Sequence, residues 1–125
     1  MAEPTKYSIL IIDDEDTSIN VLAHILRKDY TIYTAKDGKT GYEIAQEFMP
    51  DLILLDIIMP EADGHAVLSD LKASDKTRYI PVIFVTGLDT DADAVDADDF
   101  IRKPFSAAAV KAKVEKQIRR IRHIR

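Results

Sequence analysis

Short apolar runs alternate with amphipathic stretches along most of this chain. Residues 7–12 (YSILII) and 51–56 (DLILLD) are apolar runs of strand length. Such runs are typical of parallel strands that are covered on both faces. The segments 30–35 and 81–86 and the short segment 99–102 carry β-branched and aromatic residues and predict three further strands.

Between these strands, apolar residues recur at the three- and four-residue spacing of a helix face. Ile19, Leu22 and Leu26 predict a helix after the first strand, and residues 42–48 and 64–73 predict two more. From Ser106 onwards the chain is predicted to be helical to its end. Strands that alternate with helices predict an α/β fold with a parallel sheet.

The stretch between the fourth and fifth predicted strands differs from the rest. Six aspartates fall within residues 89–99. Because Asp is a poor helix former away from the first turn, we expect a shortened fourth helix of about two turns or less here.

Composition narrows the class of protein. The chain has 125 residues, 46% of them hydrophobic, which suits one globular domain with a real core. It has no cysteine, so disulfides, thiolate metal sites and thiol catalysis are excluded. No apolar run approaches the roughly 20 residues of a membrane span, and the start lacks a signal-peptide stretch. We therefore expect a cytoplasmic protein without a membrane partner.

The net charge of −5 conceals two segments of opposite sign. Residues 102–125 carry nine Lys or Arg and one Glu, a charge of +8, whereas residues 1–101 carry −13. The basic part belongs to the last predicted helix, in which Ile118, Ile121 and Ile124 form a stripe between arginines. We expect this helix to extend beyond the domain as a linker or a dimer helix. Because no aromatic or helix-turn-helix pattern accompanies the charge, nucleic acid is an unlikely partner.

Polar side chains follow the predicted strands at the edge where a parallel sheet forms its sites. Asp13 and Asp14 follow the first strand, Asp56 ends the third, Thr86 ends the fourth, and Lys103 follows the fifth. A single Asp at a strand end is usually a cap or a turn residue. The coincidence at four of the five strand ends instead predicts a site, and its clustered carboxylates favour a hard divalent cation, most plausibly Mg²⁺.

The same residues carry a family resemblance. The chain resembles the bacterial response-regulator receiver domain over about residues 6–120. The motifs that carry it are Asp13-Asp14-Glu15, Asp56 with Met59-Pro60 and Asp63-Gly64, Thr86-Gly87, and Lys103-Pro104-Phe105. The resemblance implies a flavodoxin-like (βα)₅ doubly wound sheet with strand order 2-1-3-4-5.

The resemblance also implies a role for each matching position. Asp56 is expected to accept a phosphoryl group from a histidine kinase or phosphotransfer domain. Asp13, Asp14 and Asp56, with the backbone carbonyl of Ile58, are expected to hold Mg²⁺. Lys103 is expected to contact a phosphoryl oxygen. The domain would then signal rather than act as an enzyme, catalysing only its own phosphorylation and dephosphorylation.

A conformational switch is implied as well. Thr86 is expected to bond the phosphoryl group, and Phe100 occupies the position of the family's switch aromatic. The Lys103–Pro104 bond is expected to be cis. Because Ile58 and Leu88 are apolar and cannot position an attacking water, we expect a long-lived phosphoryl state.

Other classes of protein fit less well. An aspartate-nucleophile phosphatase needs a second Asp where Ile58 stands, and no glycine motif for a nucleotide is present. The remaining alternative is a pseudo-receiver that docks or dimerises without phosphorylation. We expect residues 1–116 to form the receiver domain and residues 117–125 to extend the last helix towards an output domain. The segment order and the KPFS start of that helix resemble receivers that precede cyclic-dinucleotide signalling domains or other output domains. A homodimer through that helix is a further expectation.

Overall fold

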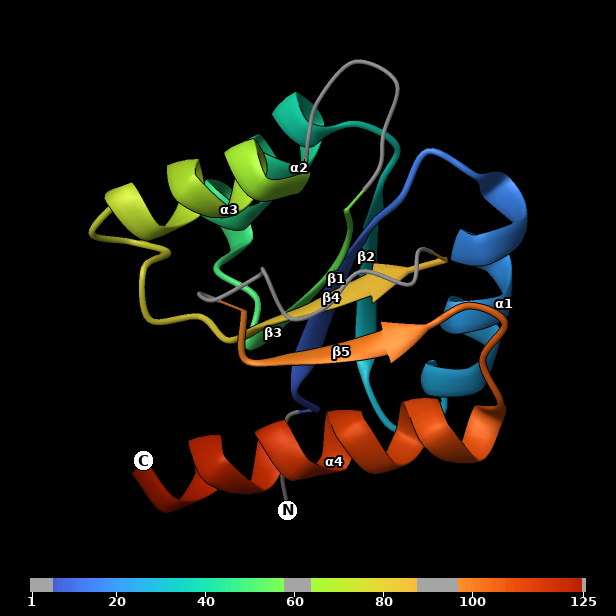
Figure 1. The fold of residues 1–125 in the computed structure, drawn as a ribbon. Coiled ribbons are helices and arrows are strands. Elements are labelled where there is room, and N and C mark those ends of the chain that lie inside the picture. The colour runs from blue at the N-terminus through green and yellow to red at the C-terminus, as the bar shows by residue number, and fades with distance from the viewer. Residues whose placement is uncertain (1–5, 58–63, 88–96, 125) are drawn as a thin grey trace.

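The computed structural model describes residues 6–57, 64–87 and 97–124, and the side chains to Arg122. Its elements follow one another in alternation (Figure 1). They are β1 (Ser8–Ile12), α1 (Asp16–Leu26), β2 (Thr31–Ala35), α2 (Gly38–Phe48), β3 (Leu52–Asp56), α3 (Gly64–Ala73), β4 (Val82–Thr86), β5 (Asp99–Arg102) and α4 (Ala107–Ile124).

The five strands form one parallel sheet in the order β2-β1-β3-β4-β5. This confirms the predicted α/β class and the strand order 2-1-3-4-5. The chain order reverses between β1 and β3, so the carboxyl ends of these two strands flank the switch point. In doubly wound folds that crevice is where sites form.

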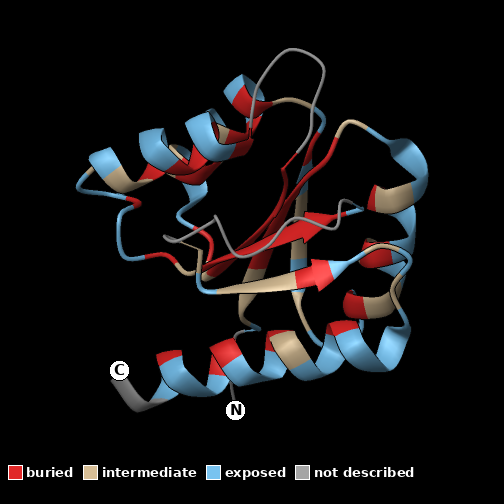
Figure 2. Ribbon diagram, viewed as in Figure 1, coloured by how far each residue is buried: buried red, intermediate tan, exposed pale blue. Residues whose placement is uncertain are grey.

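Helices cover both faces of the sheet, with α1 and α4 on one side and α2 and α3 on the other (Figure 1). Successive residues of a strand point to opposite faces. In β1, Ile9 and Ile11 therefore join the cluster under α1 and α4, whereas Leu10 and Ile12 join the one under α2 and α3. Burial on both faces explains why β1, β3 and β4 are continuous apolar runs. Figure 2 shows the buried strands between helices whose outer sides are exposed.

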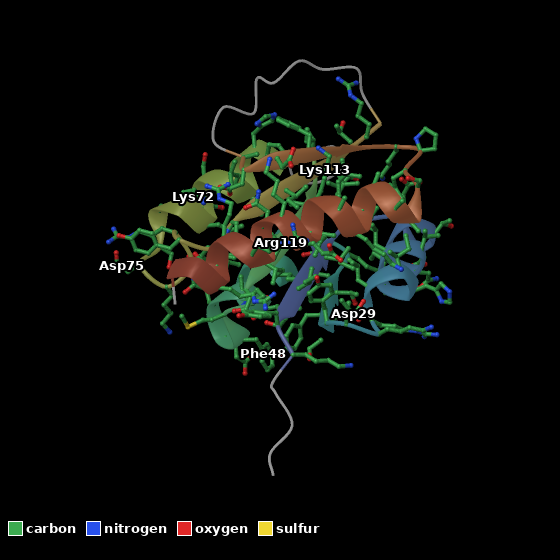
Figure 3. The ribbon with its side chains drawn as sticks, turned by 90° about the horizontal axis from the view of Figure 1, so that it is seen from below. Asp29, Phe48, Lys72, Asp75, Lys113 and Arg119 are labelled. Atoms are coloured by element: carbon green, nitrogen blue, oxygen red, sulfur yellow. The ribbon has the colours of Figure 1, made fainter. Side chains whose placement is uncertain are left out.

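The C-terminal helix packs further along the domain than the sequence suggested. Gln117, Ile118 and Ile121 are buried, and both isoleucines belong to the cluster that α4 shares with α1 and the sheet. From Val110 to Ile121 a helix advances about 17 Å, close to the length of a five-residue strand. The sheet is thus long enough to cover this stretch, so the packed part of the domain does not end at Lys116. Figure 3 shows α4 from outside, with Lys113 and Arg119 along it.

Two expectations fall outside the described residues. The shortened fourth helix was expected between Thr86 and Phe100, and residues 88–96 of that segment are not described. Ile58 and Leu88 also lie outside the described residues. Among the residues that the structure does describe, no helix combines the length and the apolar character needed to cross a membrane.

Candidate functional site

Four of the predicted site residues come together at the carboxyl edge of the sheet. Asp13 follows β1, Asp56 is the last residue of β3, Thr86 ends β4, and Lys103 follows β5. Parallel strands present their carboxyl ends at one edge, so residues far apart in sequence become neighbours. The side chains of Asp13, Asp56 and Lys103 are largely buried, with 2%, 7% and 19% of their surface exposed.

The Lys103 ammonium lies among three carboxylates. Its Nζ donates to Asp13 Oδ2 and to Glu15 Oε1, each at 3.2 Å. Asp56 Oδ2 lies 3.8 Å away, beyond ordinary hydrogen-bond distance. One cation therefore bridges the ends of β1 and β3 from the loop that follows β5.

These contacts set the proton affinity of the lysine. Burial by itself would lower the pKa of Lys103, because it disfavours the charged form. The hydrogen bond that Lys103 donates to Asp13, the negative charges of Asp13 and Asp56, and the hydrogen bond to Glu15 outweigh this effect, so the pKa of Lys103 is raised. The lysine is consequently a firmly charged ammonium over the physiological range.

Asp13 fixes the loop between β1 and α1. Its backbone N–H donates to the carbonyl oxygen of Ala35 at the end of β2, at 3.0 Å. Its Oδ1 accepts from the backbone N–H of Glu15 at 2.9 Å, while its Oδ2 accepts from Lys103. Both carboxylate oxygens of this buried side chain are therefore bonded, and Asp13 is held in one position.

Three acidic side chains are grouped closely enough to hold a metal ion. Carboxylate oxygens of Asp13, Glu15 and Asp56 all lie within 4.8 Å of one another. An all-oxygen donor set suits a hard cation such as Mg²⁺. The predicted ligand Asp14 is half-buried and is not in this group, and the predicted ligand Ile58 lies outside the described residues.

Glu15 is the site residue that sequence reasoning did not assign. Its place in the acidic run after β1 was the available signal. That run does not tell which of its carboxylates turn towards β3. The position of the Glu15 carboxylate depends on its hydrogen bond with Lys103, which lies 88 residues further along the chain.

The other end of the site links Thr86 to Phe100. The buried Thr86 accepts a hydrogen bond at its carbonyl oxygen from the Lys103 backbone N–H, at 2.7 Å, and the Lys103–Pro104 bond is cis, as expected. Phe100 is half-buried, with its ring centroid 6.1 Å from that of Phe84. A hollow of about 700 Å³ borders both Thr86 and Phe100 on the side of α4. The Phe100 side chain itself packs against the cluster under α2 and α3, on the face of the sheet opposite α4.

Several known proteins are similar to this chain in sequence. The family model described as the response regulator receiver domain matches residues 9–115. A probable cyclic di-GMP phosphodiesterase of Vibrio cholerae is 36% identical over 119 residues, which are 91% of this chain and 27% of that protein. The response regulator PleD of Caulobacter vibrioides is 38% identical over 112 residues, 85% of this chain and 25% of PleD. The chain thus spans about a quarter of the length of these relatives.

A solved structure has the same fold. It is the receiver domain of a sensor histidine kinase from Pseudomonas aeruginosa, with a magnesium ion coordinated in its active-site cleft. The two chains are 24% identical, the TM-score is 0.84, and the match covers 91% of this chain and 98% of that one. At this identity the likeness concerns the fold.

Proposed function

The chain belongs to the response regulator receiver domain family, and on that basis we propose that it is the phosphoacceptor of a two-component signalling pathway. Asp56 is the residue that takes the phosphoryl group, from a histidine kinase or a phosphotransfer domain. The observation that carries this proposal is the buried Asp56 carboxylate at the end of β3, with the Lys103 ammonium 3.8 Å away and Asp13 in the same cluster.

The transfer needs a nucleophile and a way to neutralise charge. A carboxylate oxygen of Asp56 forms a bond to phosphorus while the phosphorus–nitrogen bond of the donor's phosphohistidine breaks. The electron pair of that bond stays on the imidazole nitrogen, which leaves with the donor. Lys103, a compact cation at the same edge of the sheet, then pairs with a phosphoryl oxygen.

The residues present fit a magnesium ion. Clustered carboxylates repel one another, and a hard divalent cation with oxygen ligands relieves that repulsion. We assign the site to Asp13, Asp14 and Asp56, with the carbonyl of Ile58. When bound, Mg²⁺ would supply positive charge that offsets the phosphoryl oxygens. Asp14 stands outside the close group of carboxylates, so its side chain would turn towards Asp56 as the ion binds.

The signal leaves the site through Thr86 and Phe100. We propose that the Thr86 hydroxyl bonds a phosphoryl oxygen and draws its strand end inward, and that Phe100 turns further into the core. This is a shift between two conformations that the phosphoryl group biases. The half-buried ring of Phe100, which lies 6.1 Å from that of Phe84 and packs on the cluster under α2 and α3, supports it. Phe100 has no hydroxyl, so packing alone would hold the inward state.

The partners follow from the relatives. Because the matched relatives are about four times as long as the match, we propose that this receiver works ahead of an output domain, in the cytoplasm. Since Ile118 and Ile121 pack on the domain, only the end of the expected extension 117–125 would lead towards it. A homodimer through α4 would use the outward side of that helix, because Ile118 and Ile121 are buried in their own domain.

Mass spectrometry after incubation with acetyl phosphate tests the proposal. We expect the intact protein to gain one phosphoryl group only when Mg²⁺ is present, and Asp56→Asn to gain none. Asp75→Asn, which changes an exposed carboxylate outside the site, serves as the matched control and should be modified normally. Modification that persists in Asp56→Asn, or none in the folded wild type, would contradict the proposal. The second result would favour a docking module that is not phosphorylated.

A further inference from the structure

Glu15 directs its carboxylate away from the helix that it precedes. It is the N-cap residue of α1, a position whose side chain commonly bonds the first free N–H groups of a helix. No such bond is made here. Glu15 Oε1 instead accepts from Lys103 Nζ at 3.2 Å, and its backbone N–H is held by Asp13 Oδ1. The side chain is thus aimed at the lysine from a fixed backbone.

The three carboxylates around Lys103 do not all lie at the same distance from its ammonium nitrogen. Asp13 and Glu15 each lie 3.2 Å from Nζ, whereas Asp56 lies 3.8 Å away. An ammonium has three N–H donors, and two of them are used by acids that are not the acceptor. In this arrangement Asp13 and Glu15 therefore keep the Lys103 ammonium away from Asp56, the residue that would carry the phosphoryl group.

Asp13 and Glu15 differ in how easily they can release the lysine. The Asp13 side chain is 2% exposed and uses both oxygens, so it cannot gain water in exchange. The Glu15 side chain is 63% exposed, and exposed ion pairs are weak because water solvates both partners. Glu15 is consequently the partner that a phosphoryl oxygen can displace.

We propose that Glu15 is a positioning residue that competes with the phosphoryl group on Asp56 for the Lys103 ammonium. This inference rests on the proposed function and adds a regulatory element to the same site. Glu15 favours the unphosphorylated state, because each phosphorylation must first break its contact with Lys103. Glu15→Gln keeps the shape of the side chain but removes its charge, which weakens its hold on the Lys103 ammonium.

The test measures binding of beryllofluoride, a stable mimic of the phosphoryl group, at saturating Mg²⁺ by calorimetry. Glu15→Gln should bind it about two- to fivefold more tightly than the wild type, the effect expected for one exposed ion pair. The affinity for Mg²⁺ alone should fall, because the site loses a negative charge. If Glu15 were instead a metal ligand that the mimic requires, both affinities would fall together, and the proposal would be overturned.

Two further variants separate competition from general charge effects. Asp16→Asn removes the same charge from the neighbouring residue, which pairs with Lys36 at 2.9 Å, and should leave mimic binding unchanged. In a Lys103→Met background, Glu15→Gln should no longer improve binding, because there is no ammonium to compete for. An equal gain with and without Lys103 would mean direct repulsion of the anion and would overturn the proposal.

The outcomes also distinguish this inference from the proposed function. A wild type that binds no beryllofluoride in the presence of Mg²⁺ overturns both. A wild type that binds it, with Glu15→Gln binding equally well, overturns the competition alone. Circular dichroism of each variant confirms that the fold is intact.

Discussion

Gly64 lies directly against the backbone of Asp56, the proposed phosphoacceptor. A Cβ atom at position 64 would be 2.5 Å from the carbonyl oxygen of Asp56 and 2.6 Å from the Cα of Ile57. The Gly64 N–H donates to the carbonyl oxygen of Ile57 at 2.7 Å. The start of α3 is therefore docked on the end of β3, and only glycine allows that approach.

Gly64→Ala should destabilise the domain and displace Asp56. The added methyl would meet backbone atoms that cannot move aside, and overpacking of this kind costs about 1–3 kcal/mol. Gly87→Ala is the matched control, because the nearest contact of its Cβ among the described residues would be Lys103 Cβ at 3.8 Å, an ordinary distance. Urea unfolding measures the free energy of unfolding of the two variants. An equal loss in both would contradict the close contact at Gly64 as the cause.

The ion pair between Asp99 and Lys113 should make stability depend on pH below about 4. Burial raises the pKa of Asp99, but the bonds from Lys113 Nζ at 2.9 Å and from the Phe100 N–H outweigh it and lower the pKa overall. A lowered folded-state pKa means that the stabilisation is complete above the unfolded pKa. It is lost as the pH falls through the folded pKa, because the unfolded chain binds the proton first.

Asp99→Asn should accordingly lower the free energy of unfolding by about 1 kcal/mol at pH 7, which is the contribution of one partly buried ion pair. The loss should be smaller at pH 3. Urea unfolding of wild type and variant at both pH values gives the difference. Asp75→Asn breaks the exposed pair with Arg78 and should cost less than about 0.5 kcal/mol. A cost of Asp99→Asn that is the same at pH 3 and pH 7 would argue against the ion pair.

Gln117 should be replaceable by an apolar residue with a gain in stability. It is 2% exposed, and its Nε2 has no hydrogen-bond partner among the described residues. A buried donor without a partner costs about 1–3 kcal/mol, so Gln117→Leu should raise the free energy of unfolding by about 1–2 kcal/mol. Gln46→Leu is the contrast, since Gln46 Nε2 donates to Ser74 Oγ at 2.7 Å and its loss should destabilise. A loss of stability in Gln117→Leu would contradict this explanation.

Asp14→Asn should weaken Mg²⁺ binding by about tenfold or more, as expected when a ligand is lost. Calorimetric titration with Mg²⁺ measures the change, and Asp16→Asn controls for the lost charge. Asp14 is outside the close carboxylate group, so this variant decides whether its side chain turns inward. An unchanged affinity would remove Asp14 from the ligand set.

Thr86→Val should separate phosphorylation from switching. The variant keeps the shape of a buried side chain but loses the hydroxyl that would bond the phosphoryl group. We expect acetyl phosphate still to modify Asp56, while the aromatic NMR signals of Phe100 no longer shift on adding beryllofluoride with Mg²⁺. Thr86→Ser, which keeps the hydroxyl, should retain the shift. A full shift in Thr86→Val would show that Phe100 responds by another route.

The apolar pattern was sufficient to predict the strands and most of the packing. Runs such as YSILII can be buried on both faces only in a parallel sheet with helices on each side, and the structure confirms this. The residues at the carboxyl ends of the strands identified the edge of the site for the same reason. The structure places Asp13, Asp56, Thr86 and Lys103 together at that edge.

What the sequence could not decide depends on contacts between distant segments. Ile118 and Ile121 read as a stripe leaving the domain, because helical spacing does not tell how far a sheet extends beneath a helix. Only the packed structure brings them onto the cluster with α1.

Likewise, the run Asp13-Asp14-Glu15 offers three equivalent carboxylates. The choice of Asp13 and Glu15 as partners of Lys103 is made by a side chain that arrives after β5. The sequence by itself determined which elements form and where their polar ends meet. Tertiary structure decided which charges face one another, because electrostatic contacts depend on distances that local patterns do not encode.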